Sequence, residues 1–207
     1  MTQNIVLKND EPSLLDDVNF YILAGGKSSR MGHAKALLQW NETTIIENII
    51  NVCQSLSNRI FLVSSLNELD FLQLPIIQDH FADFGPGAGI DACLQHSHTS
   101  YNCILSCDMP FIDTLGLQHL ISYKQEADII VSKDEEQNYY FPGMYATTLK
   151  YSWRKMLLEG TKKMSHLIEN HSSIFANSST IVANNPYFYQ NINTPKDYHN
   201  ASQWIKK

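Results

Sequence analysis

The chain has 207 residues, of which 43% are hydrophobic, and it carries a formal net charge of −6. This length and composition suit one large α/β domain with a full core. The acidic balance argues against a general nucleic-acid binder, and every apolar run falls short of the ~18 residues that a membrane span requires.

The N-terminal residues 1–17 form a polar leader that lacks the basic start and apolar run of a signal peptide. We therefore expect a cytoplasmic protein that binds neither nucleic acid nor membrane. Residues 1–17 are expected to be poorly ordered, and residues 18–207 to form the domain.

The first predicted element is a buried strand at 18–24, and a cationic glycine loop follows it. The stretch LAGGKSSRMG places Gly25-Gly26 beside Lys27 and Arg30, with Lys35 shortly after. Glycines at a strand end let a ligand approach the bare backbone, and with these cations they would suit a phosphate chain. The alternative is a tight turn with solvated charges. The loop is neither a P-loop, which requires a glycine where Tyr21 stands, nor a G-x-G-x-x-G fingerprint.

Helices and strands alternate along the rest of the chain. Thr44 and Glu47 fit a capping box, so a helix is expected from Ile45 to about Ser57. The further predicted elements are strands at 59–64 and 74–78, a helix at 86–95, a strand at 101–106, a helix at 112–124 and a strand at 127–132. This alternation is typical of right-handed βαβ units. It predicts a single-domain α/β fold with a mainly parallel sheet and helices on both faces.

Parallel strands at 18–24, 59–64 and 101–106 would end at one edge of the sheet, which would gather the Gly25-Gly26 loop, Ser64 and Asp108. An acidic side chain at a strand end needs a partner. Opposite a cationic loop, Asp108 would hold a divalent metal that also binds phosphate oxygens. The alternative is that Asp108 caps the helix expected to start near Ile112.

The cysteines and histidines do not form a metal or disulfide pattern. The four cysteines are Cys53, Cys93, Cys103 and Cys107, and they include no CxxC pair. We expect them to be buried thiols. His96 and His98 lack neighbouring residues of the required ligand type, so they are interpreted as a solvated helix end.

Four segments together resemble the molybdenum cofactor guanylyltransferases, the MobA family of nucleotidyltransferases. LAGGKSSRMG with Lys35 and Leu37-Leu38 is similar to the signature LAGGxSxRMGxDKxLL. DHFADFGPGAG, at 79–89, resembles D-x-x-x-D-x-GPLAG, and SCDMP, at 106–110, resembles the CDxP metal turn. NINTPKD, at 191–197, is similar to the motif NxNTPxD, which is the most telling of the four.

The resemblance implies a Rossmann-like enzyme that transfers GMP from GTP to the molybdopterin cofactor, uses Mg²⁺ and releases pyrophosphate. Carried over by position, it assigns nucleotide binding to Leu23, Ala24, Gly25, Gly26, Lys35, Ser64, Asp79 and Asp108. Arg30, Lys35 and Asp108 would be catalytic, with Asp108 as the metal ligand. Asp79 would help to recognise guanosine, while Asn191 and Asn193 would line the pterin side. Other proteins of molybdenum cofactor biosynthesis, or acceptor proteins, would be further partners.

Three positions depart from the family pattern. Ala34 stands where the family has an acidic residue before the lysine, which would slow turnover or displace that role. Gly87 replaces the leucine of GPLAG and predicts a more flexible loop, and Ser64 replaces an asparagine near the base. Two alternatives stay open: a nucleotidyltransferase that uses CTP or activates a sugar phosphate, and a non-catalytic relative that binds nucleotide or pterin.

Overall fold

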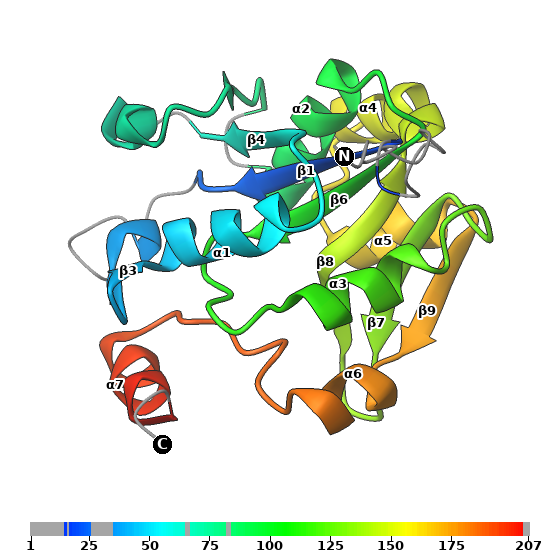
Figure 1. The fold of residues 1–207 in the computed structure, drawn as a ribbon. Helices are drawn as coiled ribbons and strands as arrows, with labels where there is room; N and C mark the ends of the chain where they lie inside the picture. Colours follow the sequence, from blue (N-terminus) through cyan, green and yellow to red (C-terminus); the bar gives the residue numbers. More distant parts are fainter. Residues whose placement is uncertain (1–14, 16, 26–34, 65–66, 82–83, 205–207) are drawn as a thin grey trace, which may run out of the picture.

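The computed structural model of the protein describes residues 15, 17–25, 35–64, 67–81 and 84–204. A seven-stranded sheet with the order β5-β4-β1-β6-β8-β7-β9 runs through it, and among these strands only β8 is antiparallel to its neighbours (Figure 1). The strands are β1 (Val18–Leu23), β4 (Ile60–Val63), β5 (Ile76–Ile77), β6 (Tyr101–Ser106), β7 (Ile129–Lys133), β8 (Asn138–Ala146) and β9 (Ser173–Asn177). The expected mainly parallel α/β fold is confirmed.

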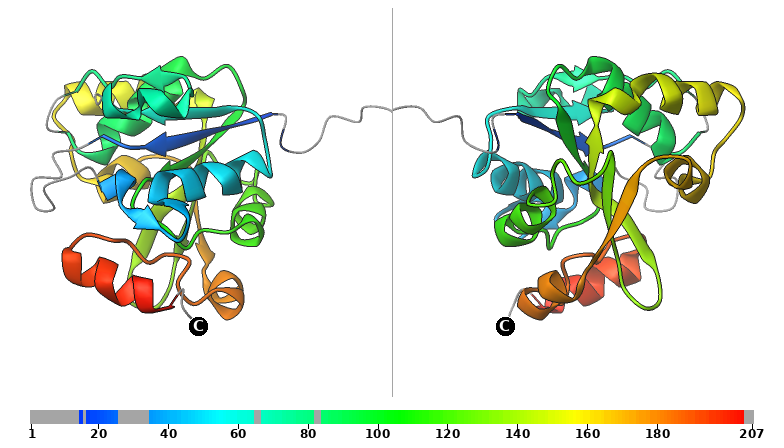
Figure 2. Two further views of the ribbon diagram at one scale, coloured as in Figure 1. Left: turned by 60° about the vertical axis from the view of Figure 1, so that its left-hand side comes forward. Right: turned by 90° about the vertical axis from the view of Figure 1, so that its right-hand side faces the viewer.

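Helices cover both faces of this sheet (Figures 1 and 2). α1 (Ile45–Gln54) and α3 (Thr114–Ile121) pack on one face, to which β1 contributes the fully buried Phe20 and Ile22. α2 (Pro86–His96), α4 (Lys150–Leu158) and α5 (Met164–Glu169) pack on the other face, to which β1 contributes Tyr21. β1 is therefore buried on both sides, as expected for the central strand of a parallel sheet. Every helix in the described part of the chain is too short or too polar to span a membrane.

Local sequence signals explain where the helices begin. α1 has the predicted capping box, in which Glu47 N donates to Thr44 Oγ1 over 3.3 Å and Thr44 N donates to Glu47 Oε2 over 2.8 Å. This helix ends at Gln54, slightly before the expected Ser57. α2 begins with Pro86 after Gly85, which has a φ of 60°.

Two sequence-based expectations about α2 are wrong. Gly87 was expected to loosen a loop, yet it lies in the first turn of α2, and its carbonyl accepts a hydrogen bond from Trp153 Nε1 over 3.0 Å. A Cβ there would lie 2.9 Å from Leu167 Cδ1, so Gly87 allows α5 to pack closely. At the other end, His98 is exposed as expected, but His96 is partly buried, with Nδ1 2.9 Å from the Tyr21 hydroxyl. Burial lowers the pKa of His96.

The shorter elements complete the chain. They are η1 (Lys35–Leu37), the β2–β3 pair (Gln39–Trp40 and Thr43–Thr44), η2 (Asn67–Leu72), η3 (Thr147–Leu149), α6 (Ser179–Asn184) and α7 (Pro195–Trp204). Of the predicted leader, Leu15 and Asp17 are described, and Asp17 Oδ1 accepts a hydrogen bond from Ser100 N over 3.1 Å. The rest of the leader lies outside the described residues.

The chain after α6 returns to the edge of the sheet at which the parallel strands end. We call residues 185–204 the C-terminal strap. Asn185 Nδ2 donates to Phe111 O over 2.7 Å, and Ile192 N donates to Asp108 O over 2.8 Å. Further along, the Tyr198 hydroxyl donates to Gln39 O over 2.6 Å. The strap therefore bridges the turn after β6 and the segment that contains η1 and β2 (Figure 1).

Candidate active site

The C-terminal ends of β1, β4 and β6 meet at one edge of the sheet, as predicted, and that of β5 joins them there. Ala24 N donates to Val63 O over 2.9 Å, Ser64 N donates to Ile77 O over 3.0 Å, and Cys107 N donates to Leu23 O over 3.1 Å. The backbone after β1 is thus bonded to the ends of both neighbouring strands. Asp79 is exposed two residues after β5, on the same edge.

Gly25 is the last described residue before the cationic loop, and it is exposed. It is not among the residues with positive φ, so its backbone conformation does not itself require glycine. A Cβ at Gly25 would lie 3.7 Å from Val63 O, which is ordinary contact within the protein. The remaining reason for glycine is close approach by a ligand. The predicted site residues Gly26 and Arg30, with Lys27 and Ala34, lie outside the described residues.

Two predicted nucleotide-binding residues face inward. Ser64 is only 2% exposed, and its hydroxyl lies 3.4 Å from Ala24 O, to which it donates. Leu23 packs against α2, where its Cδ2 lies 3.0 Å from the position of a Cβ on Gly89. Both side chains are directed into the protein, so Leu23 and Ala24 present backbone atoms at this edge.

Asp108 lies in the turn after β6, close to a cation. Its Oδ1 accepts a hydrogen bond from Ser106 Oγ over 2.7 Å, and its Oδ2 is 3.8 Å from Lys35 Nζ. In this ion pair the Asp108 side chain is only 15% exposed and the Lys35 side chain only 18% exposed. The alternative role as a helix cap is wrong, because Asp113 caps α3 by accepting a hydrogen bond from Gly116 N over 2.8 Å. The described contacts of the Asp108 side chain are therefore those with Ser106 and Lys35.

Lys35 reaches this turn from the first residue of η1. The following Ala36 is buried, which anchors the short helix against the core. Lys35 Nζ donates to Asn193 Oδ1 over 2.8 Å while it lies beside Asp108. The fold therefore brings together three predicted site residues that belong to three separate sequence motifs.

The cysteine expectation is confirmed in its main point. Cys53, Cys93 and Cys103 are buried, and all four thiols are free. Cys107, beside Asp108, is partly covered. Burial, with a smaller effect of Asp108, raises the pKa of Cys107 to about 12. Its thiol is therefore neutral at physiological pH.

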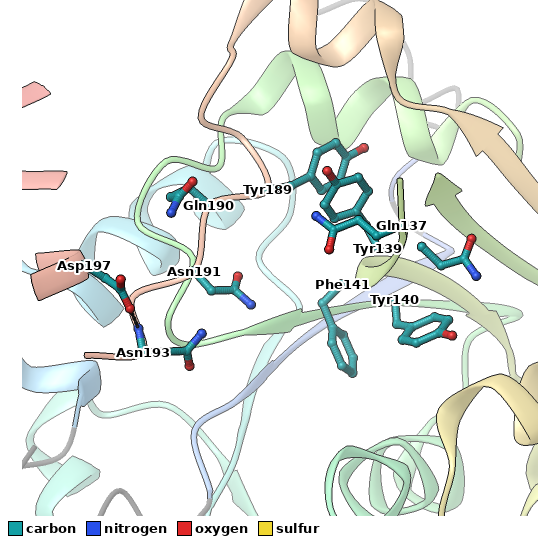
Figure 3. Close-up of a pocket in the computed structure, with 10 residues that line it drawn as sticks. Gln137, Tyr139, Tyr140, Phe141, Tyr189, Gln190, Asn191, Asn193 and Asp197 are labelled. Carbon is teal, nitrogen blue, oxygen red and sulfur yellow. Dashed lines mark hydrogen bonds between the residues drawn. The ribbon is translucent and has the colours of Figure 1, made fainter. Parts of the chain in front are cut away.

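Asn191 and Asn193 lie on either side of the fully buried Ile192 in the strap. Both line a pocket of about 460 Å³ between the strap and the start of β8. Figure 3 shows their side chains pointing from the strap toward the space in front of Phe141. Because Asn193 also accepts a hydrogen bond from Lys35, the pocket adjoins the Lys35–Asp108 pair.

The opposite side of the pocket is aromatic, and the sequence analysis did not predict it. The rings of Tyr139 and Tyr189 stack with centroids 4.1 Å apart (Figure 3). The Tyr189 hydroxyl donates to Ser132 Oγ over 2.7 Å, and the Tyr139 hydroxyl donates to Asp134, so the β7–β8 hairpin is joined to the strap. Burial raises the pKa of Tyr189 to about 12. The polar run DEEQN, at 134–138, directly before YYF was the available signal for this hairpin.

The donor set at the site limits which kind of metal can bind. The described residues contain no group of three or more His, Cys, Asp or Glu side chains able to enclose an ion. Asp108 offers one carboxylate, of which Oδ1 is engaged by Ser106. This single carboxylate fits a divalent cation whose coordination is completed by phosphate oxygens, as is usual for Mg²⁺.

Comparisons with known proteins identify one family of similar proteins. Residues 20–174 match the model of the MobA-like NTP transferase domain. A probable molybdenum cofactor guanylyltransferase from Flavobacterium johnsoniae is 39% identical over 133 residues, which cover 64% of this chain and 70% of that protein.

Two solved structures share the fold. Molybdopterin-guanine dinucleotide biosynthesis protein A from Archaeoglobus fulgidus superposes with a TM-score of 0.78 at 20% identity, over 91% of this chain and 98% of that one. Rv0371c from Mycobacterium tuberculosis, in complex with manganese, superposes with a TM-score of 0.58 at 15% identity, over 77% of this chain and 87% of that one.

Proposed function

This chain belongs to the MobA-like NTP transferase family, and we propose that it transfers GMP from GTP to the molybdopterin cofactor, releasing pyrophosphate. It is a nucleotidyltransferase of molybdenum cofactor biosynthesis, because it matches an NTP transferase family and its relative from Flavobacterium johnsoniae is named a probable molybdenum cofactor guanylyltransferase. The observation that carries this proposal is the junction at which Lys35 contacts both Asp108 and Asn193.

That junction lies between two spaces of different character. On one side is the edge formed by Gly25, Ser64 and Asp79, where a nucleoside triphosphate would approach the backbone after β1. On the other side is the pocket lined by Asn191, Asn193 and the stacked tyrosines, whose flat aromatic and amide surfaces suit a heterocycle such as a pterin. The reacting phosphates of the two substrates would meet at Lys35.

The reaction is a phosphoryl-group substitution, and positioning and charge neutralisation supply most of its catalysis. A phosphate oxygen of molybdopterin attacks the α-phosphorus of GTP, and a new P–O–P bond forms. The bond from the α-phosphorus to the bridging oxygen breaks, and pyrophosphate leaves with the electron pair. Lys35, together with Arg30 of the cationic loop, would neutralise the triphosphate and the leaving group.

Asp108 would hold Mg²⁺. When bound, this ion supplies positive charge that offsets the repulsion between the two phosphates. Asp79 would recognise guanosine from its exposed position after β5. Gly26 would contribute backbone contacts beside Gly25, and Ser64 would hold the loop from beneath through Ala24.

A nucleotide panel tests this function. The purified protein is incubated with molybdopterin, Mg²⁺ and one of GTP, CTP, ATP or UTP, and the dinucleotide cofactor and pyrophosphate are measured. We expect both products with GTP, and background levels with the other three and with the Asp108→Asn variant. A preference for CTP would replace the guanylyl assignment. An absence of pyrophosphate with every nucleotide would instead indicate a non-catalytic binding protein.

A further inference from the structure

The start of α7 contains a second capping box, and it lies next to the site. Asp197 Oδ2 accepts hydrogen bonds from Thr194 N over 2.8 Å and from Asn193 N over 3.0 Å. In return, Asp197 N donates to Thr194 Oγ1 over 3.1 Å. Pro195 occupies the first helical position, where its missing N–H costs nothing. The motif NTPxD therefore begins α7 with a capping box, and its carboxylate also accepts a hydrogen bond from Asn193 N, one residue before the capping Thr194.

The residue that this carboxylate reaches is the one that holds Lys35. Asn193 is exposed, so packing does not fix its main chain. It is fixed on one side by Ile192, whose N–H is bonded to Asp108 O, and on the other side by Asp197. The Asn193 side chain then accepts the hydrogen bond from Lys35 Nζ. Asp197 therefore acts on Lys35 through Asn193, in addition to the direct attraction between their charges.

We propose that Asp197 is a positioning residue of the transfer reaction. Its carboxylate fixes Asn193, and the Asn193 side chain holds Lys35 beside Asp108 and lines the pocket between the strap and the start of β8. The role rests on the proposed function. It extends the site to a carboxylate that binds the backbone N–H groups of Asn193 and Thr194 and lies four residues along the chain from the asparagine that it orients. The bonds from Asn193 and Thr194 lower the pKa of Asp197, so the carboxylate is ionised at neutral pH and accepts strongly.

The kinetic test compares three variants. Asp197→Ala removes the carboxylate, Asp197→Glu supplies the side chain that capping boxes ordinarily use, and Glu47→Ala removes the matching carboxylate from the capping box of α1. GMP transfer is measured while GTP and molybdopterin are varied in turn. For Asp197→Ala we expect kcat/KM for molybdopterin to fall about tenfold to a hundredfold, the range for a misplaced reacting group. Asp197→Glu should recover most of this loss, and Glu47→Ala should keep the wild-type value.

A second measurement does not depend on the proposed function. The rate at which N-hydroxysuccinimide acetate acylates Lys35 is followed by mass spectrometry in the same proteins. We expect Lys35 of Asp197→Ala to react several-fold faster than in the wild type, and Lys35 of Glu47→Ala to react at the wild-type rate. Absence of GMP transfer by the wild type would refute the proposed function and leave this measurement to decide the inference. An unchanged Lys35 rate in Asp197→Ala, or an equal loss of kcat/KM in Glu47→Ala, would overturn it.

Discussion

The replacement Asp108→Asn is the sharpest test of the chemistry at this site. Asparagine keeps the shape of the side chain and an oxygen that can accept the hydrogen bond from Ser106 Oγ, now 2.7 Å long. The change removes the negative charge that lies 3.8 Å from Lys35 Nζ. It therefore tests the charge of Asp108 with little change to the turn that carries it.

The expected loss follows from two effects of that charge. Without it, Mg²⁺ would lose the protein ligand that we propose for it, and metal assistance to phosphoryl chemistry contributes several kcal/mol. In addition, two opposite charges about 4 Å apart attract by about 4 kcal/mol before solvation costs when the effective dielectric constant is near 20, so Lys35 also loses much of its anchoring. We expect GMP transfer to fall at least about a thousandfold, which corresponds to about 4 kcal/mol.

The assay is GMP transfer across a Mg²⁺ titration, with thermal unfolding measured in parallel. Asp113→Asn is the matched control, because it makes the same substitution five residues later at the cap of α3, where asparagine is an equally good N-cap. We expect this control to retain activity, even though it disturbs the 2.6 Å hydrogen bond from Asn185. Near-normal activity of Asp108→Asn with normal Mg²⁺ dependence would refute the reasoning.

Three other perturbations follow from the site geometry. Within the described part of the chain, a Cβ at Gly25 meets nothing closer than 3.7 Å, so Gly25→Val should unfold near the wild-type temperature and lose GTP binding; unchanged affinity would remove Gly25 from the site. Lys35→Ala should lower turnover on the order of 10²-fold with a small change in stability, and a loss below about threefold would make Lys35 a solvated charge. Because burial raises the pKa of Cys107 to about 12, iodoacetamide at pH 8 should alkylate it at least about a hundredfold more slowly than a free cysteine, and faster as pH rises; rapid labelling at pH 8 would contradict a buried neutral thiol.

The features that sequence predicted well are those with local causes. The apolar run of β1, the Thr44–Glu47 box and the turn residues after each strand are encoded within a few neighbouring positions. Right-handed βαβ connections then place the ends of β1, β4 and β6 at one edge. This reasoning was sufficient to bring Asp108 to the edge where Gly25 lies.

The strand β8 was missed because its causes are not local. It enters the sheet between β6 and β7 by antiparallel pairing with both, and chain order does not reveal that position. Its sequence NYYFPGMYA also contains Pro142 and Gly143, which count against a central strand. In the structure Gly143 is needed there, because a Cβ would lie 2.7 Å from Tyr140 O. The aromatic side of the pocket was therefore absent from the prediction.

The joining of Lys35 to Asn193 was likewise beyond local reasoning, since 158 residues separate them. Only the resemblance of NINTPKD to a family motif connected the strap to the site, and it gave no geometry. Asp108 and Asp113 illustrate the same limit over five residues. Asp108 precedes the helix predicted at 112–124 and Asp113 lies within it, and only the backbone path shows which of them accepts the hydrogen bond from Gly116.

The strap has a consequence for how the enzyme fails under mild denaturation. Among the ten residues of α7, Ala201 alone is fully buried. The helix contacts the rest of the protein through the Tyr198–Gln39 hydrogen bond and through Trp204, whose ring centroid is 5.7 Å from that of Phe111. A segment with so little buried apolar surface opens at a lower free energy than the sheet. Its release would free Asn193 on the side that Asp197 holds, while β1, β4 and β6 remain folded. We therefore expect activity in urea to fall before the circular dichroism does.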